Sequence, residues 1–342
     1  MGLGSLKLGR PMIVRCLFRV AVLAVIGVVV PAIIVVSTDD GAASANDGAA
    51  STGGPAGGGT DALRLLPANT ALVITWNVRR TGRSAAGRAI VAALLRSGEI
   101  AEKAAKLRTR AGLSIERDID TAIVAMADDF AQSRDIAVVL GGRFAESAVI
   151  TAARQASSSF ASARHRGAVY YVLDGDTALA FLDGYLVITP KDTMVEIIDV
   201  YRGTSRSAVS TSALTTLLPR GPTGSDLWAV FVIPAKLRAD IARDTGGHSV
   251  EAVMAKVDMQ SGLSLRIRLH LSSRQAASAV AVLLRKSAAD AAGTPELAAL
   301  GLARPLSSAS VQQTGSRLDV QLDVPRGTVD KIVHRALGPS TK

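Results

Sequence analysis

Runs of apolar residues after residue 61 divide the chain into short predicted strands and helices. Residues 71–78 are densely apolar and β-branched and directly follow Leu66 and Pro67, which is typical of a strand. Residues 84–95 begin with Ser84 and carry apolar residues at helical spacing, which predicts a helix. By the same criteria we expect helices over 100–111, 145–156 and 193–201, and strands over 120–126, 136–140, 168–173, 178–182 and 185–189.

Asp-Gly pairs separate the last of these strands. Asp174-Gly175-Asp176 and Asp183-Gly184 stand between short apolar runs, and this arrangement indicates hairpin turns. Consecutive hairpins interleaved with helices predict an α+β fold with mostly antiparallel or mixed sheet and helices packed on one face. A doubly wound parallel sheet is the alternative topology.

The hydrophobic pattern starts again near residue 227. We expect strands over 227–233, 252–258, 263–271, 311–313 and 318–324, and helices over 275–286 and 328–337. This order matches that of the preceding elements and predicts two similar lobes from an internal duplication. A first constant offset relates Ile136, Val138, Leu140, Arg143 and Ala148 to Ile267, Leu269, Leu271, Arg274 and Ala279. A second, slightly larger offset relates Pro190, Thr193, Ile197, Ile198 and Gly203 to Pro325, Thr328, Ile332, Val333 and Gly338.

The chain before residue 61 has a different pattern. Residues 1–19 contain four basic residues and no acid, and residues 20–37 contain no charge at all. A helix of that length rises about 27 Å, close to the hydrocarbon thickness of a bilayer. Asp39 and Asp40 follow, and a basic flank before an acidic one keeps the N-terminus in the cytoplasm. We therefore expect a single-pass anchor in a bacterial inner membrane, with the remaining chain outside the cytoplasm. Cleavage as a signal peptide near Ala45, followed by secretion, is the alternative.

The expected organisation has six parts. A basic cytoplasmic flank covers 1–19, and a transmembrane helix or signal segment covers 20–37. Residues 38–60 contain no large apolar residue, which predicts a disordered Gly/Ala/Ser tether. The first α+β lobe covers 61–203, a linker rich in Ser, Thr, Gly and Pro covers 204–224, and the second α+β lobe covers 225–342.

Composition excludes several classes of function. The chain contains a single Cys, which permits neither a disulfide framework nor a multi-Cys metal site. None of the four His has a ligand at metal-binding spacing, so we expect solvated surface His. No phosphate-loop, dinucleotide or G-x-S-x-G motif is present. We expect no cofactor, no metal and no catalytic residue.

Charge supplies the remaining candidate chemistry. The net charge is +10, and aromatic residues make up only 4%, which disfavours nucleic acid as a partner. Arg266, Arg268 and His270 alternate with apolar residues in a predicted strand, so they share one face. Together with Arg143, which follows Gly141-Gly142, they are candidates for binding an anionic lipid or envelope polymer. Asp319 and Asp323 lie on one face of a neighbouring predicted strand, where we expect them to neutralise Arg266 and Arg268.

Binding or scaffolding in the cell envelope, without catalysis, is the function that this pattern favours. An envelope hydrolase with scattered site residues and a carrier of an apolar ligand are the alternatives. Convergent Asp, Ser or His side chains in a cleft would favour the hydrolase. A large apolar cavity would favour the carrier.

Overall fold

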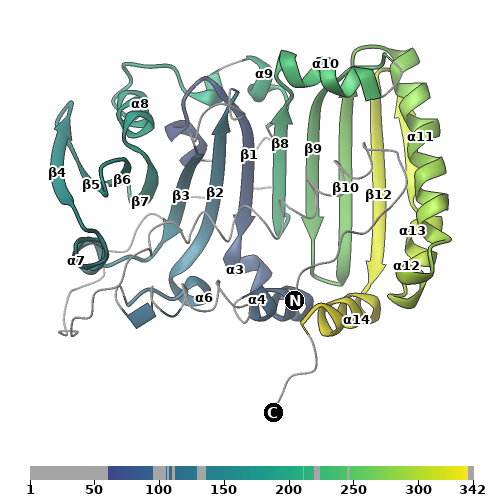
Figure 1. The fold of residues 1–342 in the computed structure, drawn as a ribbon, viewed down its shortest axis with the longest axis horizontal. Coiled ribbons are helices and arrows are strands. Elements are labelled where there is room, and N and C mark those ends of the chain that lie inside the picture. The colour runs from purple at the N-terminus through teal and green to yellow at the C-terminus, as the bar shows by residue number, and fades with distance from the viewer. Residues whose placement is uncertain are drawn as a thin grey trace.

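The computed structural model describes residues 61–94, 105, 108–109, 112–128, 136–210, 212–218, 224–244 and 247–337. Its strands form one 12-stranded sheet in the order β11-β12-β10-β9-β8-β1-β2-β3-β7-β6-β5-β4, which runs across the whole of Figure 1. Neighbouring strands in this order are all antiparallel. The predicted antiparallel sheet is confirmed, and the doubly wound parallel alternative is wrong.

The N-terminal half of the sheet contains the β1–β7 strands. Its elements are η3 (Ala62–Leu65), β1 (Thr70–Asn77), α3 (Val78–Thr81), α4 (Ala85–Leu94), α6 (Ile115–Asp118), β2 (Ile119–Ala127), β3 (Ile136–Gly142), α7 (Glu146–Ala156), β4 (Phe160–His165), β5 (Ala168–Leu173), β6 (Thr177–Leu182), β7 (Tyr185–Pro190), α8 (Lys191–Tyr201), η4 (Ala208–Ser210) and α9 (Ser212–Thr215).

The C-terminal half contains the remaining strands. Its elements are β8 (Leu227–Val232), α10 (Ala235–Asp244), β9 (Val250–Asp258), β10 (Gly262–Leu271), α11 (Arg274–Ala292), α12 (Pro295–Ala299), α13 (Ala303–Ser307), β11 (Ser310–Thr314), β12 (Arg317–Pro325) and α14 (Arg326–Leu337).

Most predicted elements are present within a few residues of their expected bounds. The strand β4 was not predicted, because its FASARH sequence has no dense apolar run. The short helices α3, α6, α12 and α13 and the charged helix α10 were not predicted either. The predicted helix over 100–111 lies almost entirely outside the described residues.

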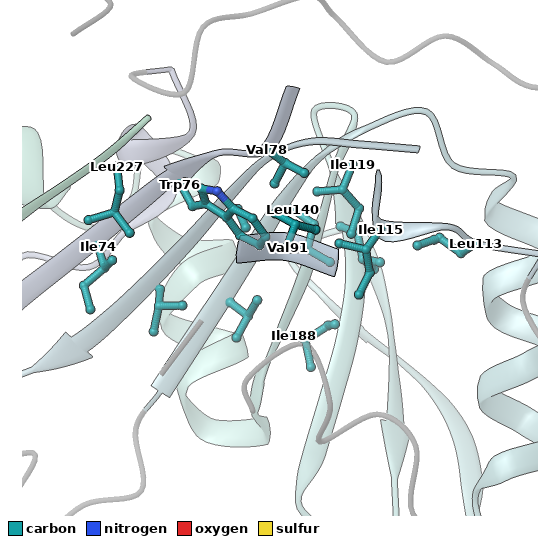
Figure 2. Close-up of a cluster of buried hydrophobic side chains, with 14 of the residues drawn as sticks. Ile74, Trp76, Val78, Val91, Leu113, Ile115, Ile119, Leu140, Ile188 and Leu227 are labelled. Carbon is teal, nitrogen blue, oxygen red and sulfur yellow. The ribbon is translucent and has the colours of Figure 1, made fainter. Parts of the chain in front are cut away.

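Two opposite faces of the sheet bury separate hydrophobic cores. On what we call the first face, Ile74, Val124 and Val138 belong to a core that also contains Trp76 and is drawn in Figure 2. On the second face, the alternate residues of the same strands form another core, in which Val73, Ile123 and Val139 are at most 1% exposed. Because successive strand residues point to opposite faces, apolar residues at consecutive positions are buried on both sides.

Helices cover both faces, so the prediction that they pack on one face is wrong. Val91 of α4 and Val149 of α7 pack in the first-face core. Met194 and Ile197 of α8 are fully buried in the second-face core together with Leu66, which follows η3. A sheet buried on both sides in its N-terminal half needs helices on each side, because unprotected apolar faces would contact water.

The two halves are not separate sheets, because β1 pairs with β8. The register places Val73 opposite Val230 and Thr75 opposite Trp228. The first-face core crosses this junction and includes Leu227 and Val324. Part of the expected linker over 204–224 also packs in the second-face core, where Ala208, Leu214 and Leu217 are buried. The division into two lobes stays a prediction, since the sheet continues across it.

The strand order supports a duplicated topology, and Pro190 and Pro325 each end a strand directly before a closing helix, but the second offset does not extend into those strands. The order β8-β9-β10-β12-β11 repeats the order β1-β2-β3-β7-β6, and β5 and β4 extend only the N-terminal half. Val138 pairs with Ile188. The first offset relates Val138 to Leu269, and the second offset, continued into the strand, relates Ile188 to Asp323. Together the two offsets would therefore place Asp323 opposite Leu269. The observed partner of Leu269 is Leu318. An odd slip reverses the face of each side chain, so the second offset does not relate equivalent strand positions.

The closing helices of the two halves pack on opposite faces. Ile197 and Ile198 of α8 are buried in the second-face core. Val329 of α14 is buried in the first-face core, and Val333 packs against that core. This difference explains why the Pro-x-x-Thr similarity at the start of the two helices does not extend to the pairing of the strands before them.

None of the described helices is long and apolar enough to span a bilayer. The predicted membrane segment 20–37 and the predicted tether 38–60 lie outside the described residues.

Gly142 provides a test of the close packing between β3 and α6. A Cβ at this position would lie 2.1 Å from the backbone oxygen of Asp118 and 3.0 Å from the Cα of Ile119. Gly142→Ala should lower the free energy of unfolding by about 2 kcal/mol, because backbone atoms must move.

Urea unfolding of the full chain in mild detergent measures this loss. Gly327→Ala in α14 is the matched control, since its added Cβ meets no atom within 4 Å, and alanine is the better helix former. An equal loss in both variants would contradict the predicted contact.

Candidate functional site

The four predicted anion-binding residues do not form one site. Arg143 is exposed just after β3, and its backbone N–H donates to the Asp118 oxygen at 2.8 Å. Arg266, Arg268 and His270 lie on β10. Four strands separate β3 from β10, which corresponds to about 24 Å at the usual strand spacing. Arg143 is therefore separate from the other candidates, and only the β10 residues remain together.

The polar residues of β10 belong to the second face of the sheet. Residues that pair across strands lie on the same face, and one such row can be followed through the sheet. From the second-face core to the sheet edge, the row contains Val73, Val230, Met254, Arg268, Asp319 and Gln312. The face thus changes from buried and apolar over β1 to polar and partly exposed over β10, β12 and β11.

The second-face core ends on β9, where Ala252 is buried and Met254 packs against it, and no helix of the described residues belongs to a core on this face over β10, β12 and β11. The helix α11 packs on the first face, where Ala277 and Val280 contact a core containing Leu269 and Leu318. The helix α14 also packs on that side. We call this surface the open face, and it presents Lys256, Ser264, Arg266, Arg268, His270, Ser310, Gln312, Thr314, Arg317, Asp319, Gln321 and Asp323.

The predicted neutralisation of the β10 arginines is half right. Arg268 Nε donates to Asp319 Oδ1 at 2.6 Å, and Arg317 Nε lies 3.5 Å from the other oxygen of Asp319. Asp323 instead accepts hydrogen bonds from Ser264 Oγ at 2.6 Å and Gln321 Nε2 at 2.7 Å.

These hydrogen bonds, and secondarily the charge of Arg266, lower the pKa of Asp323. Arg266 itself pairs in register with Gln321 rather than with an acid. Within the described residues, no acid forms an ion pair with Arg266 within 4 Å.

His270 contributes no positive charge to the open face at neutral pH. Burial lowers its pKa, and the charges of Arg268 and Arg317 lower it further, while Asp319 and Glu251 act in the opposite direction. Its Nε2 atom is buried and has no hydrogen-bond partner. A group whose ordinary pKa is about 6.5 is neutral at pH 7 once that pKa is lowered.

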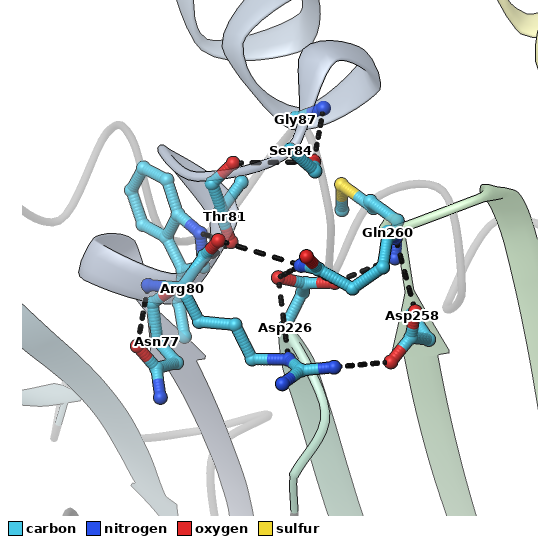
Figure 3. Close-up of polar contacts among 10 residues, drawn as sticks. Asn77, Arg80, Thr81, Ser84, Gly87, Asp226, Asp258 and Gln260 are labelled. Carbon is cyan, nitrogen blue, oxygen red and sulfur yellow. Dashed lines mark hydrogen bonds and ion pairs between the residues drawn. The ribbon is translucent and has the colours of Figure 1, made fainter.

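A second polar cluster lies at the junction of the two halves and was not predicted. Asp226 directly precedes β8 and is fully buried. Its Oδ2 accepts the Met259 backbone N–H at 2.5 Å, and the side-chain amide of Gln260 donates to Oδ1 at 3.1 Å. Arg80 Nε lies 3.7 Å from Asp226 Oδ1. Figure 3 shows these groups converging from α3, β8 and the β9–β10 turn.

Local sequence explains how Arg80 reaches this cluster. Asn77 ends β1, and its side chain accepts the Arg80 backbone N–H at 2.8 Å, which starts α3. Trp76 Nε1 donates to Thr81 Oγ1 at 3.0 Å and fixes the other end of this turn. The guanidinium of Arg80 also donates to Asp258 Oδ2 at 2.8 Å. These contacts join α3, the start of β8 and the β9–β10 turn. Because Asp226 is fully buried among them, it is inaccessible to a substrate.

His165 differs from the expected solvated surface His, because it has a carboxylate partner. Its Nε2 lies 2.7 Å from Asp199 Oδ1, and Arg166 Nε donates to the same oxygen. The hydrogen bond with His165, followed by that from Arg166, lowers the pKa of Asp199. The cluster connects the end of β4 to α8 through one carboxylate.

The Asp-Gly turns are confirmed. Asp174 and Asp183 adopt positive φ angles of 50° and 52°, which Asp tolerates in hairpin turns. Asp174 Oδ1 also accepts the Ser158 backbone N–H at 2.9 Å. Among the described residues, no group of three or more His, Cys, Asp and Glu side chains is placed to hold a metal ion.

Comparisons with known proteins do not identify a family. No family model matches the chain, and no curated protein matches it. Crystal form III of TP0453 aligns with a TM-score of 0.48 and 11% identity, covering 79% of this chain and 97% of that chain. Crystal form IV aligns with a TM-score of 0.46 and 10% identity, covering 81% of this chain and 96% of that chain. At these TM-scores and identities, the likeness supports no statement about function.

The buried carboxylate of Asp226 should be important for stability. Asp226→Ala removes the acceptor for Met259 and Gln260 and a counter-charge of Arg80, so the free energy of unfolding should fall by about 3 kcal/mol. Asp258→Ala is the matched control, because this side chain is 37% exposed and its loss should cost less than about 1 kcal/mol. Urea unfolding at pH 7 compares the two, and equal losses would contradict a central role for Asp226.

The Asp199 cluster should make stability depend on pH. A carboxylate with a lowered folded-state pKa stabilises the fold above its unfolded pKa of about 4, and this contribution disappears as pH falls through the lowered value. Asp199→Asn should therefore reduce stability at pH 7 and make the loss of stability below pH ~4 shallower. Urea midpoints at pH 7 and pH 3 measure both effects. The exposed Asp290→Asn is the control, and an unchanged acid response in Asp199→Asn would exclude the predicted linkage.

Proposed function

We propose that the chain is a membrane-anchored extracytoplasmic protein of the bacterial cell envelope that binds or scaffolds other envelope components without catalysis. The observation that carries this function is the open face, a polar surface over β10, β12, β11 and the Lys256 end of β9. The same side of the sheet is covered by η3 and α8 in the N-terminal half, so the absence of a described helix on the open face distinguishes it from a completed core.

The chemistry of the open face suits binding better than reaction. Its cations and carboxylates are spread along strands, and Asp319 and Asp323 are held by hydrogen bonds to their neighbours. The fully buried carboxylate of Asp226 is surrounded by donors from three segments of the chain.

The N-terminal pattern supports the location. Residues 20–37 are uncharged and lie between a basic flank and Asp39-Asp40. The shared strand order of the two halves supports descent from a duplicated unit. In this proposal the duplication supplied a wide sheet, and the C-terminal half left one side of it available for binding.

Reporter fusions test the location. Alkaline phosphatase, which is active only outside the cytoplasm, should be active when fused after residue 60, and removal of residues 20–37 should abolish that activity. The fused chain should remain in the membrane after alkaline carbonate extraction without a loss of mass.

Activity of a cytoplasm-only reporter at the same position would overturn the proposed topology. An exported product shortened near Ala45 and free of the membrane would replace the anchor with a cleaved signal peptide.

A further inference from the structure

The open face contains two cations that lie directly opposite each other on adjacent strands. Lys256 on β9 and Arg266 on β10 are cross-strand partners and lie on the same face. Like charges directly opposite each other in a sheet are destabilising. No ion pair within 4 Å joins either residue to an acid in the described part of the chain, in contrast to Arg268, which pairs with Asp319.

The surroundings of this pair also favour an anion. Arg268 and Arg317 share the single carboxylate of Asp319, so one positive charge of this trio is unbalanced. Two carboxylates near the pair have partners of their own: Asp258 accepts from Arg80 at 2.8 Å, and Asp323 accepts from Ser264 and Gln321. Glu251 lies at the opposite end of β9, where its charge acts on His270. The open face as a whole carries an excess of positive charge, because Lys256, Arg266, Arg268 and Arg317 are answered only by Asp319 and Asp323, while Asp258 is paired with Arg80.

We propose that Lys256 and Arg266 bind the phosphate groups of anionic phospholipids and dock the open face on the outer surface of the membrane in which the chain is anchored. The membrane anchor in this inference rests on the proposed function. The lipid as partner of the open face is inferred separately, from Lys256 and Arg266. An ammonium and a guanidinium on adjacent strands can each donate to phosphate oxygens.

Chain length favours a bilayer as the occupant. Residues 38–60 separate the predicted membrane segment from the first described element, and a flexible chain of this length spans about 26 Å on average. The folded part would therefore stay within reach of the membrane surface, where a tether raises the effective concentration of the lipid for the open face. Each basic residue near an anionic surface strengthens such contact about fivefold.

Energy transfer in reconstituted full-length protein tests this docking. A donor dye is placed on the open face by Gln312→Cys in a Cys16→Ser background, with acceptor dye on lipid headgroups. We expect transfer to increase when phosphatidylglycerol is added to phosphatidylcholine vesicles and to fall in high salt, which screens charges at exposed sites. A donor at Val282→Cys, on the solvent side of α11 where Val282 is 62% exposed, should show no such increase.

Charge-removing variants identify the residues responsible. Lys256→Gln combined with Arg266→Gln should weaken docking about 25-fold without unfolding the protein, because neither side chain takes part in an ion pair with a described residue. Arg304→Gln combined with Arg335→Gln removes the same charge from exposed positions on α13 and α14 and should leave docking unchanged. Equal losses in both double variants would overturn the assignment in favour of general electrostatic attraction.

Flotation on neutral vesicles separates this inference from the proposed anchor. If the chain floats with phosphatidylcholine alone but energy transfer ignores phosphatidylglycerol, the docking inference is wrong and the anchor remains. If it floats only with phosphatidylglycerol, and only with Lys256 and Arg266 intact, the anchor is wrong and the docking stands. No flotation on either lipid overturns both. If soluble polyphosphate abolishes transfer and lipid composition has no effect on it, the face is assigned to an anionic polymer instead.

Discussion

The β1–β8 pairing is the interaction on which the remaining structure depends. It joins strands from the two halves of the chain in register, with Ile74 opposite Ala229 and Val73 opposite Val230. Without this ladder each half would expose an apolar strand edge with unpaired backbone groups, an arrangement that promotes aggregation. The pairing also lets the first-face core continue from Ile74 to Leu227. The buried Asp226 lies where β8 begins, and Arg80 follows the end of β1, so the polar cluster holds this junction from one side.

The two faces of the continuous sheet differ in its C-terminal half, both in the polarity of their side chains and in the helices that cover them. On the first face, the row through Ile74, Ala229 and Ile267 stays apolar, and α11 and α14 cover its far end. On the second face, the equivalent row becomes polar at Arg268. A polar row requires no helix above it, and α14 packs on the first face although its counterpart α8 packs on the second. The closing helix α14 therefore covers the apolar side of the strands, and their polar side is the one without such a helix.

The charged residues of the structure divide according to burial. Asp226 is inaccessible, so each of its oxygen atoms needs a donor from the protein, and Met259 and Gln260 donate to them, while Arg80 is an ion-pair partner at 3.7 Å. Arg266 is exposed, so water can solvate it and no internal partner is required. Removal of a buried carboxylate should consequently change the stability of the fold, whereas an exposed cation that lacks a partner is available for binding a ligand. Arg266 meets this condition and Lys256 lies half-buried opposite it, while Arg268 already has Asp319.

The sequence by itself determined the local features of this protein. Period-two alternation located β10 and placed Arg266 and Arg268 on one face, and Asp-Gly pairs located the hairpin turns. These features depend on residues within a few positions of one another. The tertiary structure alone decided that the two halves form one sheet, that helices cover both faces, that α8 and α14 pack on opposite sides, and that Asp226 meets Arg80. Backbone hydrogen bonds are the same for every strand, so a strand's own sequence does not name its distant partner. That choice emerges only when all cores are buried together, and it is the choice that brought Arg80 to Asp226.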